Sequence, residues 1–320
     1  MTTMTSRRLD RRRFLQAAGV LSGTALAWHC TPAPLLALQA SPLEEMRNQI
    51  GAQPLVTTKL NERMVLLSGP GGNVVVHHGP AGMIVVDGFV KPAWPKLEAA
   101  LAAIGAMPLK SLIDTHWHFD HADNNSHFRD EGAGVIAHEN TKRRLMQSHD
   151  VRGLHFDPVA DDALPTQTFT AGLTLNFNGE QIDLRHVAPA HTDTDTFVRF
   201  PKADVLHMGD IFFNGFYPFI DASTGGHING MVDGAAAGLN IIGAQTKVVP
   251  GHGPLGSRGS LQAYHRMLGT VRDTIGAAKK AGKSLADVQA AKPTAAFDAD
   301  WGKGMLGPDA FVELVYTTVR

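Results

Sequence analysis

The sequence is short of cysteine, of net charge and of long apolar runs, and each shortage excludes a class of protein. The single cysteine, Cys30, rules out an intramolecular disulfide and any zinc site built entirely from protein thiolates. The 29 basic and 30 acidic residues balance, whereas a nucleic-acid-binding protein normally has a basic excess. We therefore expect no nucleic-acid partner. The apolar content of 43% predicts a globular chain that buries a core.

The N-terminal segment has the pattern of an export signal. Arg11–Arg13 precede Phe14–Leu15, and a modestly apolar stretch follows over residues 17–28. This stretch is too short to span a bilayer as a stable helix, and small residues follow it. The paired arginines resemble the twin-arginine class of signals, which export folded proteins. We predict a signal peptide over residues 1–40, cleaved after Ala40, and a periplasmic or secreted mature protein without stable membrane insertion.

Residues 41–320 alternate strand-like and helix-like segments without an evident linker, so we predict a single domain with two similar halves. Short β-branched runs predict strands, and apolar residues at helical spacing predict helices. The predicted strands are 63–68, 73–78, 83–87, 109–114, 135–138, 173–177, 181–187, 196–200, 205–208 and 247–250. The predicted helices are 93–104, 139–148, 232–242, 261–281 and one that begins at Asp309. This mixture predicts an α/β fold in which helices cover sheets.

Four potential metal ligands, His116, His118, Asp120 and His121, lie within six residues directly after the predicted strand 109–114. Residues two apart in an extended segment point the same way, so His116 and His118 can bind one metal ion. Asp120 and His121 can turn towards a second ion. Three imidazoles and a carboxylate are costly to pack together unless a cation holds them. The run therefore predicts a metal site.

Three further potential ligands, His191, Asp210 and His252, each follow a predicted strand and lie at a turn marked by glycine, proline or threonine. Loops on a rigid scaffold commonly carry functional residues. Imidazole nitrogen and carboxylate oxygen suit zinc, and also iron or manganese.

The order and spacing of these ligands resemble the metallo-β-lactamase-fold superfamily, which includes glyoxalase II. The resemblance covers about residues 55–255. It implies a four-layer αβ/βα sandwich with two metal ions, expected to be zinc, at one edge between the sheets. By this pattern the ligands divide into a set for the first zinc, a set for the second zinc and a bridge: His116, His118 and His191; Asp120, His121 and His252; and Asp210.

The resemblance implies a hydrolase that uses a metal-bound hydroxide, because zinc lowers the pKa of bound water to about 7. The expected substrate is a small molecule with an ester, thioester, lactone or β-lactam group. Asp120 is expected to orient the nucleophile or to relay its proton. Asp210 departs from the dedicated β-lactamase branches, which commonly carry cysteine or serine there, and is similar to glyoxalase II and lactonases. A β-lactamase proper, with broad low activity, is therefore an alternative.

The aromatic segment 212–219, which follows Asp210, is predicted to form a wall or lid over the metals, with ordinary core packing as the alternative. Within it, Tyr217 is predicted to donate a hydrogen bond to a developing oxyanion. Asp87, at the end of a predicted strand, is predicted to support the metal loop through hydrogen bonds. Two other classes stay open: an iron-dependent oxidoreductase like persulfide dioxygenase, which uses a single metal, and a metal-binding protein without catalysis.

Overall fold

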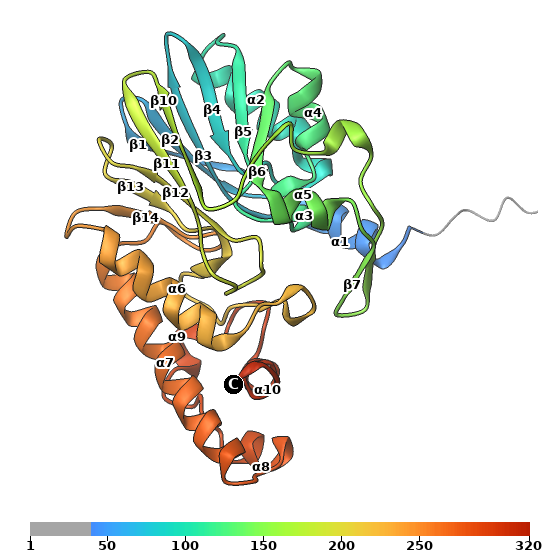
Figure 1. Cartoon of the computed structure of the whole chain (residues 1–320), viewed down its shortest axis with the longest axis vertical. Helices are drawn as coiled ribbons and strands as arrows, with labels where there is room; N and C mark the ends of the chain where they lie inside the picture. The colour runs from blue at the N-terminus through green and yellow to red at the C-terminus, as the bar shows by residue number, and fades with distance from the viewer. Residues whose placement is uncertain (1–39) are drawn as a thin grey trace, which may run out of the picture. The chain divides into compact units, whose positions relative to one another are not determined.

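Two β-sheets packed face to face form the centre of the computed structural model, which describes residues 40–320 (Figure 1). The predicted signal peptide lies outside the described residues, apart from Ala40. Residues 40–320 cluster as one compact unit. None of the helices in this part of the chain combines the length and the hydropathy needed to cross a membrane.

The first sheet has seven strands, which pair antiparallel through the β1–β4 meander and parallel from β4 onwards. Crossover helices connect the parallel strands, as parallel pairing requires. In spatial order the strands are β1 (Val56–Asn61), β2 (Met64–Gly69), β3 (Gly72–Gly79), β4 (Gly82–Val86), β5 (Leu109–Ile113), β6 (Gly134–His138) and β9 (Gln167–Phe169).

The second sheet has five strands, of which the first four pair antiparallel and the last pair is parallel. In spatial order they are β10 (Gly172–Phe177), β11 (Glu180–His186), β12 (Thr196–Phe200), β13 (Val205–His207) and β14 (Lys247–Val249). A separate hairpin of β7 (His149–Val151) and β8 (Leu154–Phe156) projects beyond the sheets (Figure 1).

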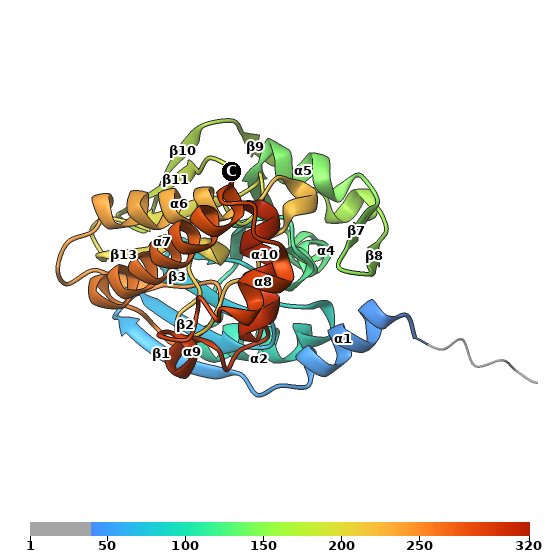
Figure 2. The same cartoon turned by 90° about the horizontal axis from the view of Figure 1, so that it is seen from below.

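Helices cover the outer faces of both sheets (Figures 1 and 2). The first half carries α1 (Pro42–Gly51), α2 (Trp94–Ile104), α3 (Phe119–Ala122), α4 (Asn125–Asp130) and α5 (Glu139–Leu145). The second half carries α6 (Ile228–Ile241), α7 (Arg258–Lys280), α8 (Leu285–Ala290), α9 (Asp298–Trp301) and α10 (Pro308–Thr318).

Strand alternation divides the apolar residues among three buried layers. On β4, Ile84 and Val86 face the core between the sheets, whereas Met83 and Val85 face the core beneath α2. Side chains alternate between the two faces of a strand, so a strand covered on both sides is apolar throughout. The third layer packs the second sheet against α6, α7 and α10. The predicted four-layer αβ/βα sandwich is confirmed.

The predicted elements are present, and their ends shift where a polar side chain caps a helix. Helix α6 begins at Ile228 rather than at residue 232, because the ring of His227 accepts a hydrogen bond from the backbone N–H of Gly230 at 2.9 Å. Helix α7 begins at Arg258 because Ser257 and Ser260 form a capping box. The predictions missed the short or weakly patterned elements α1, β1, β7, β8, β9, α3, α4, α8 and α9.

Gly230 allows α6 to start directly against the loop that leads to His191. A Cβ atom at this position would lie 1.9 Å from the carbonyl oxygen of Pro189 and 2.9 Å from Cα of Ala190. We predict that Gly230→Ala lowers the free energy of unfolding by about 1–3 kcal/mol, although alanine favours helix. Urea denaturation measures this change.

The matched control is Gly269→Ala on α7, where a Cβ atom would meet nothing within 4 Å. We expect this second substitution to raise the free energy of unfolding by about 0.5–1 kcal/mol through helix propensity alone. Equal effects of the two substitutions would contradict the close approach at Gly230.

Candidate metal centre

The first four predicted ligands lie on a short segment held by a buried carboxylate. The segment follows β5 and enters α3. Asp87 accepts hydrogen bonds from the backbone N–H of Thr115 at 2.8 Å, from the Thr115 hydroxyl at 2.9 Å and from Nδ1 of His121 at 2.8 Å. One carboxylate thus joins both ends of the segment, and the predicted supporting role of Asp87 is confirmed.

The other three predicted ligands come from the second sheet. His191 lies in the loop between β11 and β12, Asp210 lies in the 3-10 turn η3 (Gly209–Ile211) after β13, and His252 follows β14. The backbone at Gly251 passes so close to Asp210 that a Cβ atom would lie 1.9 Å from its Oδ1 atom. Glycine is therefore required beside His252 for the two turns to meet.

The loop that carries His191 is shaped by Asp195. This buried carboxylate accepts hydrogen bonds from the backbone N–H of His191 at 2.8 Å and from the hydroxyl of Thr192 at 2.6 Å. Burial raises the pKa of Asp195 to about 7, against the stabilising bonds from Thr192. These bonds fold the loop back so that the His191 ring points towards the first segment.

All seven predicted ligands come together in two groups. Within each group the ligand atoms lie within 4.8 Å of one another. The first group is His116, His118, His191 and Asp210, and the second group is Asp120, His121 and His252. The two groups correspond to the two sets that the resemblance implies, except that Asp210, expected as a bridge, groups with the first set.

Asp210 stands between the two groups. Its carboxylate oxygens lie 3.2 Å from Nε2 of His121 and of His252, 3.4 Å from Nε2 of His191 and 3.8 Å from Nε2 of His116. Four imidazoles from both groups therefore face one carboxylate, which is the arrangement that a bridging ligand needs.

Hydrogen bonds on the outer side of three rings leave a nitrogen lone pair on the inner side. His116 bonds Thr115 through Nδ1, His121 bonds Asp87 through Nδ1, and His191 bonds the carbonyl of Phe219 through Nδ1. In each case the inward nitrogen is Nε2. A neutral imidazole that donates from one nitrogen offers the other to a metal, so these bonds select the tautomer that binds metal.

His118 has the opposite orientation, and its partner is a residue that the sequence predictions missed. Its Nε2 lies 3.2 Å from Asp221, while its Nδ1 faces His191 at 2.8 Å. Asp221 is buried and also accepts bonds from the hydroxyls of Ser223 and Thr224. The pattern Asp-x-Ser-Thr, which is typical of an Asx turn, was the available signal.

The donor set fits divalent metal ions. Nε2 of His116, Nε2 of His121 and Oδ1 of Asp210 are buried and have no hydrogen-bond partner within residues 40–320. Buried polar atoms without a partner are rare and costly, so these atoms are suited to bind a cation. Neutral nitrogen and carboxylate oxygen donors at this spacing are those that zinc, iron or manganese accept.

The charges of the cluster also favour binding of a cation. Burial opposes the charged form of His252, yet Asp210 and Asp120 raise the pKa of this ring to about 10. By contrast, burial lowers the pKa of His191 to about 4, so this ring keeps its lone pair at neutral pH. The carboxylates therefore draw positive charge into a space that burial otherwise keeps free of ions.

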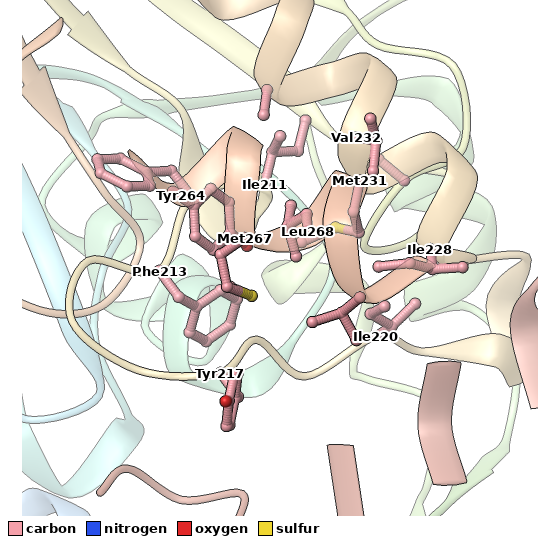
Figure 3. Packing of buried hydrophobic residues seen from close by; sticks show 14 of the residues in the cluster. Ile211, Phe213, Tyr217, Ile220, Ile228, Met231, Val232, Tyr264, Met267 and Leu268 are labelled. Atoms are coloured by element: carbon pink, nitrogen blue, oxygen red, sulfur yellow. The ribbon is translucent and has the colours of Figure 1, made fainter. Parts of the chain in front are cut away.

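The aromatic segment 212–219 lines the cluster in two places and is otherwise core. The Phe213 ring stacks on His252 with centroids 5.1 Å apart, and the Phe219 ring lies 6.0 Å from that of His118. Figure 3 shows Phe213 and Tyr217 among the apolar side chains packed against α6 and α7. Core packing therefore describes most of the segment, while the rings of Phe213 and Phe219 lie against His252 and His118; the predicted wall or lid stays a prediction.

The structure does not bring Tyr217 into the cluster. Its hydroxyl donates to Asp298 at 2.8 Å, and its ring stacks on Phe311 with centroids 4.4 Å apart. Burial and the neighbouring carboxylate of Asp298 raise the pKa of Tyr217. The geometry supports a packing role on the side of the C-terminal helices and gives no support to oxyanion binding.

Comparisons with known proteins agree with this geometry. The model of the family described as "Metallo-beta-lactamase superfamily" matches residues 68–266, more than half of the chain. The chain belongs to the metallo-beta-lactamase superfamily. The alpha subunit of 2,4-dinitroanisole O-demethylase from Nocardioides sp. (strain JS1661) is 26% identical over 141 residues. The aligned part is 43% of this chain and 40% of that subunit, so less than half of the relative is matched.

Solved structures of other proteins share the fold. A metallo-beta-lactamase from Pontibacter korlensis aligns with a TM-score of 0.58 at 18% identity, over 68% of this chain and 99% of that one. The stereoselective inverting sec-alkylsulfatase Pisa1 from Pseudomonas sp. aligns with a TM-score of 0.60 at 12% identity, over 82% of this chain and 50% of that one. At these identities the likeness shows the fold alone.

Replacing Asp87 tests whether its hydrogen bond to His121 orients this ring for metal binding. We predict that Asp87→Asn weakens metal affinity by roughly tenfold to a hundredfold. An amide N–H facing Nδ1 of His121 favours the tautomer with a proton on Nε2, which removes the inward lone pair. Competition with a chelator measures the affinity. The control is Asp150→Asn on the exposed face of β7, and equal affinities for the two variants would contradict this role.

Replacing Tyr217 tests whether this residue has a packing role or a catalytic role. We expect Tyr217→Phe to leave turnover with any accepted substrate unchanged and to lower the free energy of unfolding by about 1 kcal/mol through the lost bond to Asp298. Steady-state kinetics and thermal unfolding separate the two effects. A fall in turnover with unchanged stability would restore the role predicted from the sequence.

Proposed function

We propose that this superfamily member is a hydrolase that holds two zinc ions and acts on a small molecule with an ester, thioester, lactone or β-lactam group. The observation that carries the proposal is the joining of two ligand groups around Asp210, whose Oδ1 has no hydrogen-bond partner within residues 40–320. A carboxylate shared by two ligand groups is suited to a two-metal site. Such ions, when bound, supply Lewis acidity and a lowered pKa of water at neutral pH.

Asp120 is the residue best placed to handle the proton of an attacking water. Its carboxylate lies 3.3 Å from Nε2 of His252, at the open side of the cluster, where 14% of the Asp120 side chain and 21% of the His252 side chain are exposed. Despite burial, His121 and His252 lower the pKa of Asp120, so it is ionised and can accept a proton.

Asp210 supports a general hydrolase rather than a dedicated β-lactamase. Its two oxygens already face histidines of both groups, at 3.2 Å from His121 and from His252. A cysteine or serine offers one ligand atom, whereas a carboxylate offers two and can serve both groups. A β-lactamase proper with broad low activity is the alternative that a substrate panel decides.

Export is a separate part of the proposal. We propose that the twin-arginine pattern at Arg11–Arg13 carries the folded protein to the periplasm or beyond, with cleavage near Ala40. A cluster whose ligands come from both sheets forms only when the chain is folded. Export after folding would therefore allow metal to be loaded before the protein leaves the cytoplasm.

The test combines metal analysis with a substrate panel. We expect roughly two zinc ions per chain, and activity that a chelator abolishes and zinc restores. The panel holds a phenyl ester, a thioester, a lactone, a β-lactam, a phosphodiester, a secondary alkyl sulfate and 2,4-dinitroanisole; the last two follow the names of the structural and sequence relatives. We predict that His116→Ala abolishes turnover, whereas the control His265→Ala on α7 leaves it unchanged.

Each other outcome identifies an alternative class. One iron ion per chain with oxygen consumption would indicate a dioxygenase-like oxidoreductase. Two metal ions without turnover of any compound would indicate a metal-binding protein. Full activity of His116→Ala would overturn the proposal itself.

A further inference from the structure

Helix α5 connects the first half of the fold to the loop that carries His191. Two of its side chains bind Asp193, which lies two residues after His191. Nε and Nη2 of Arg144 donate to the two carboxylate oxygens of Asp193 at 3.1 and 2.7 Å. The side-chain amide of Asn140 donates to the backbone carbonyl of Asp193 at 2.8 Å. Both the side chain and the backbone of Asp193 are therefore fixed to this helix.

The spacing of these residues on α5 explains why both reach the same partner. Asn140 and Arg144 are four positions apart and share one face of the helix. The side chains of Arg144 and Asp193 are only 20% and 15% exposed, and two hydrogen bonds join them. Exposed ion pairs with a single contact contribute little, whereas a largely buried arginine–carboxylate pair with two bonds fixes the relative position of its partners.

The start of α5 is also fixed against the second sheet. Nδ1 of His138 accepts a hydrogen bond from the backbone N–H of Asn140 at 3.2 Å and so caps the helix. The His138 ring stacks on the ring of His186, the last residue of β11, with centroids 3.7 Å apart. Nδ1 of His186 lies 3.1 Å from the backbone carbonyl of Asp195 in the ligand loop. The helix is therefore tied to the loop at one end through this stack and at the other end through Arg144.

The other side of the loop is held by the turn that orients His118. The backbone carbonyl of His191 accepts a hydrogen bond from the N–H of Asp221 at 2.9 Å, and the N–H of Asp193 donates to the carbonyl of Thr224 at 3.0 Å. His191 thus lies between this turn and α5. Loss of the contacts on one side leaves those on the other, so we expect a shift of the His191 ring rather than loss of the fold.

We propose that Arg144 is a positioning residue of the metal centre: through Asp193 it holds the His191 ring in place for the metal ion of the first ligand group. The second group, Asp120, His121 and His252, comes from other segments of the chain. The inference rests on the proposed two-metal hydrolase, and it predicts that the two ions respond differently to the loss of one side chain that is not a ligand.

Stepwise removal of metal from the zinc-loaded full chain tests this assignment. Samples are dialysed against increasing concentrations of a chelator, and the zinc retained per chain is measured. We expect Arg144→Gln to weaken one of the two ions by about tenfold and to leave the other unchanged. Asp193→Asn should have the same effect, and Arg144→Lys should restore part of the affinity because lysine keeps the charge without the paired bonds. The control is Arg143→Gln on the same helix, because Arg143 is 55% exposed and approaches Asp193 only to 3.9 Å.

A second comparison separates the positioning of His191 from a general effect on the structure. In a His252→Ala background the first ligand group is complete, so Arg144→Gln should still weaken zinc by about tenfold. In a His191→Ala background the ring that Arg144 positions is absent, so Arg144→Gln should leave the zinc affinity unchanged. Weakening in both backgrounds would indicate a general structural role and would overturn the assignment, as would unchanged affinities in both single variants, Arg144→Gln and Asp193→Asn.

Failure of the proposed function gives different results. A wild-type chain that retains only one ion would overturn the two-zinc hydrolase, and the comparison of the two backgrounds would still decide whether Arg144 positions His191. Retention of no zinc would overturn both proposals. Two ions with turnover of a panel compound, combined with equal zinc affinities of Arg144→Gln and wild type, would leave the hydrolase intact and remove the role of Arg144.

Discussion

A carboxylate that faces four imidazoles in a nearly dry space is the interaction on which the rest of this protein depends. The Asp210 side chain is only 5% exposed and lies within 4 Å of His116, His121, His191 and His252. An ionised group without compensation in such a place costs several kcal/mol. The fold tolerates the buried carboxylate because imidazole rings face its two oxygens. The inward nitrogen atoms of these rings are placed to bind a cation.

The fold holds these groups in place through its turns. Each ligand lies just beyond the end of a strand, and the turns are stiffened by buried carboxylates rather than by apolar contacts. Asp87 joins the ends of the first ligand segment, Asp195 folds the loop of His191, and Asp221 fixes the ring of His118. Close backbone contacts at Gly251 and Gly230 remove the remaining freedom. Hydrogen bonds and close contacts of the protein itself therefore orient the ligand side chains.

The ligands and layers could be predicted from sequence because they depend on local signals. Ligands follow buried strands at Gly-marked turns, and the β4 run Met83–Val86 is apolar on both faces because helices cover one side. The position of Tyr217 could not be predicted, since it depends on how segment 212–219 packs against helices near the C-terminus. Tyr217 stacks on Phe311 and donates a hydrogen bond to Asp298, and both residues lie more than 80 positions later in the chain. No sequence pattern near Tyr217 predicts these contacts.

The difference between local signals and long-range packing also explains why family membership indicates the metal ligands better than the substrate. The matched region, residues 68–266, contains all seven ligands, and their spacing is tied to the sheets. The surroundings of these ligands include a cavity between the β7–β8 hairpin and α10, which begins at Pro308, outside the matched region. A hairpin tip and a terminal helix can change without disturbing the ligand turns, because neither contributes a metal ligand. Positions on the hairpin and on α10 can therefore vary while the metal centre stays the same.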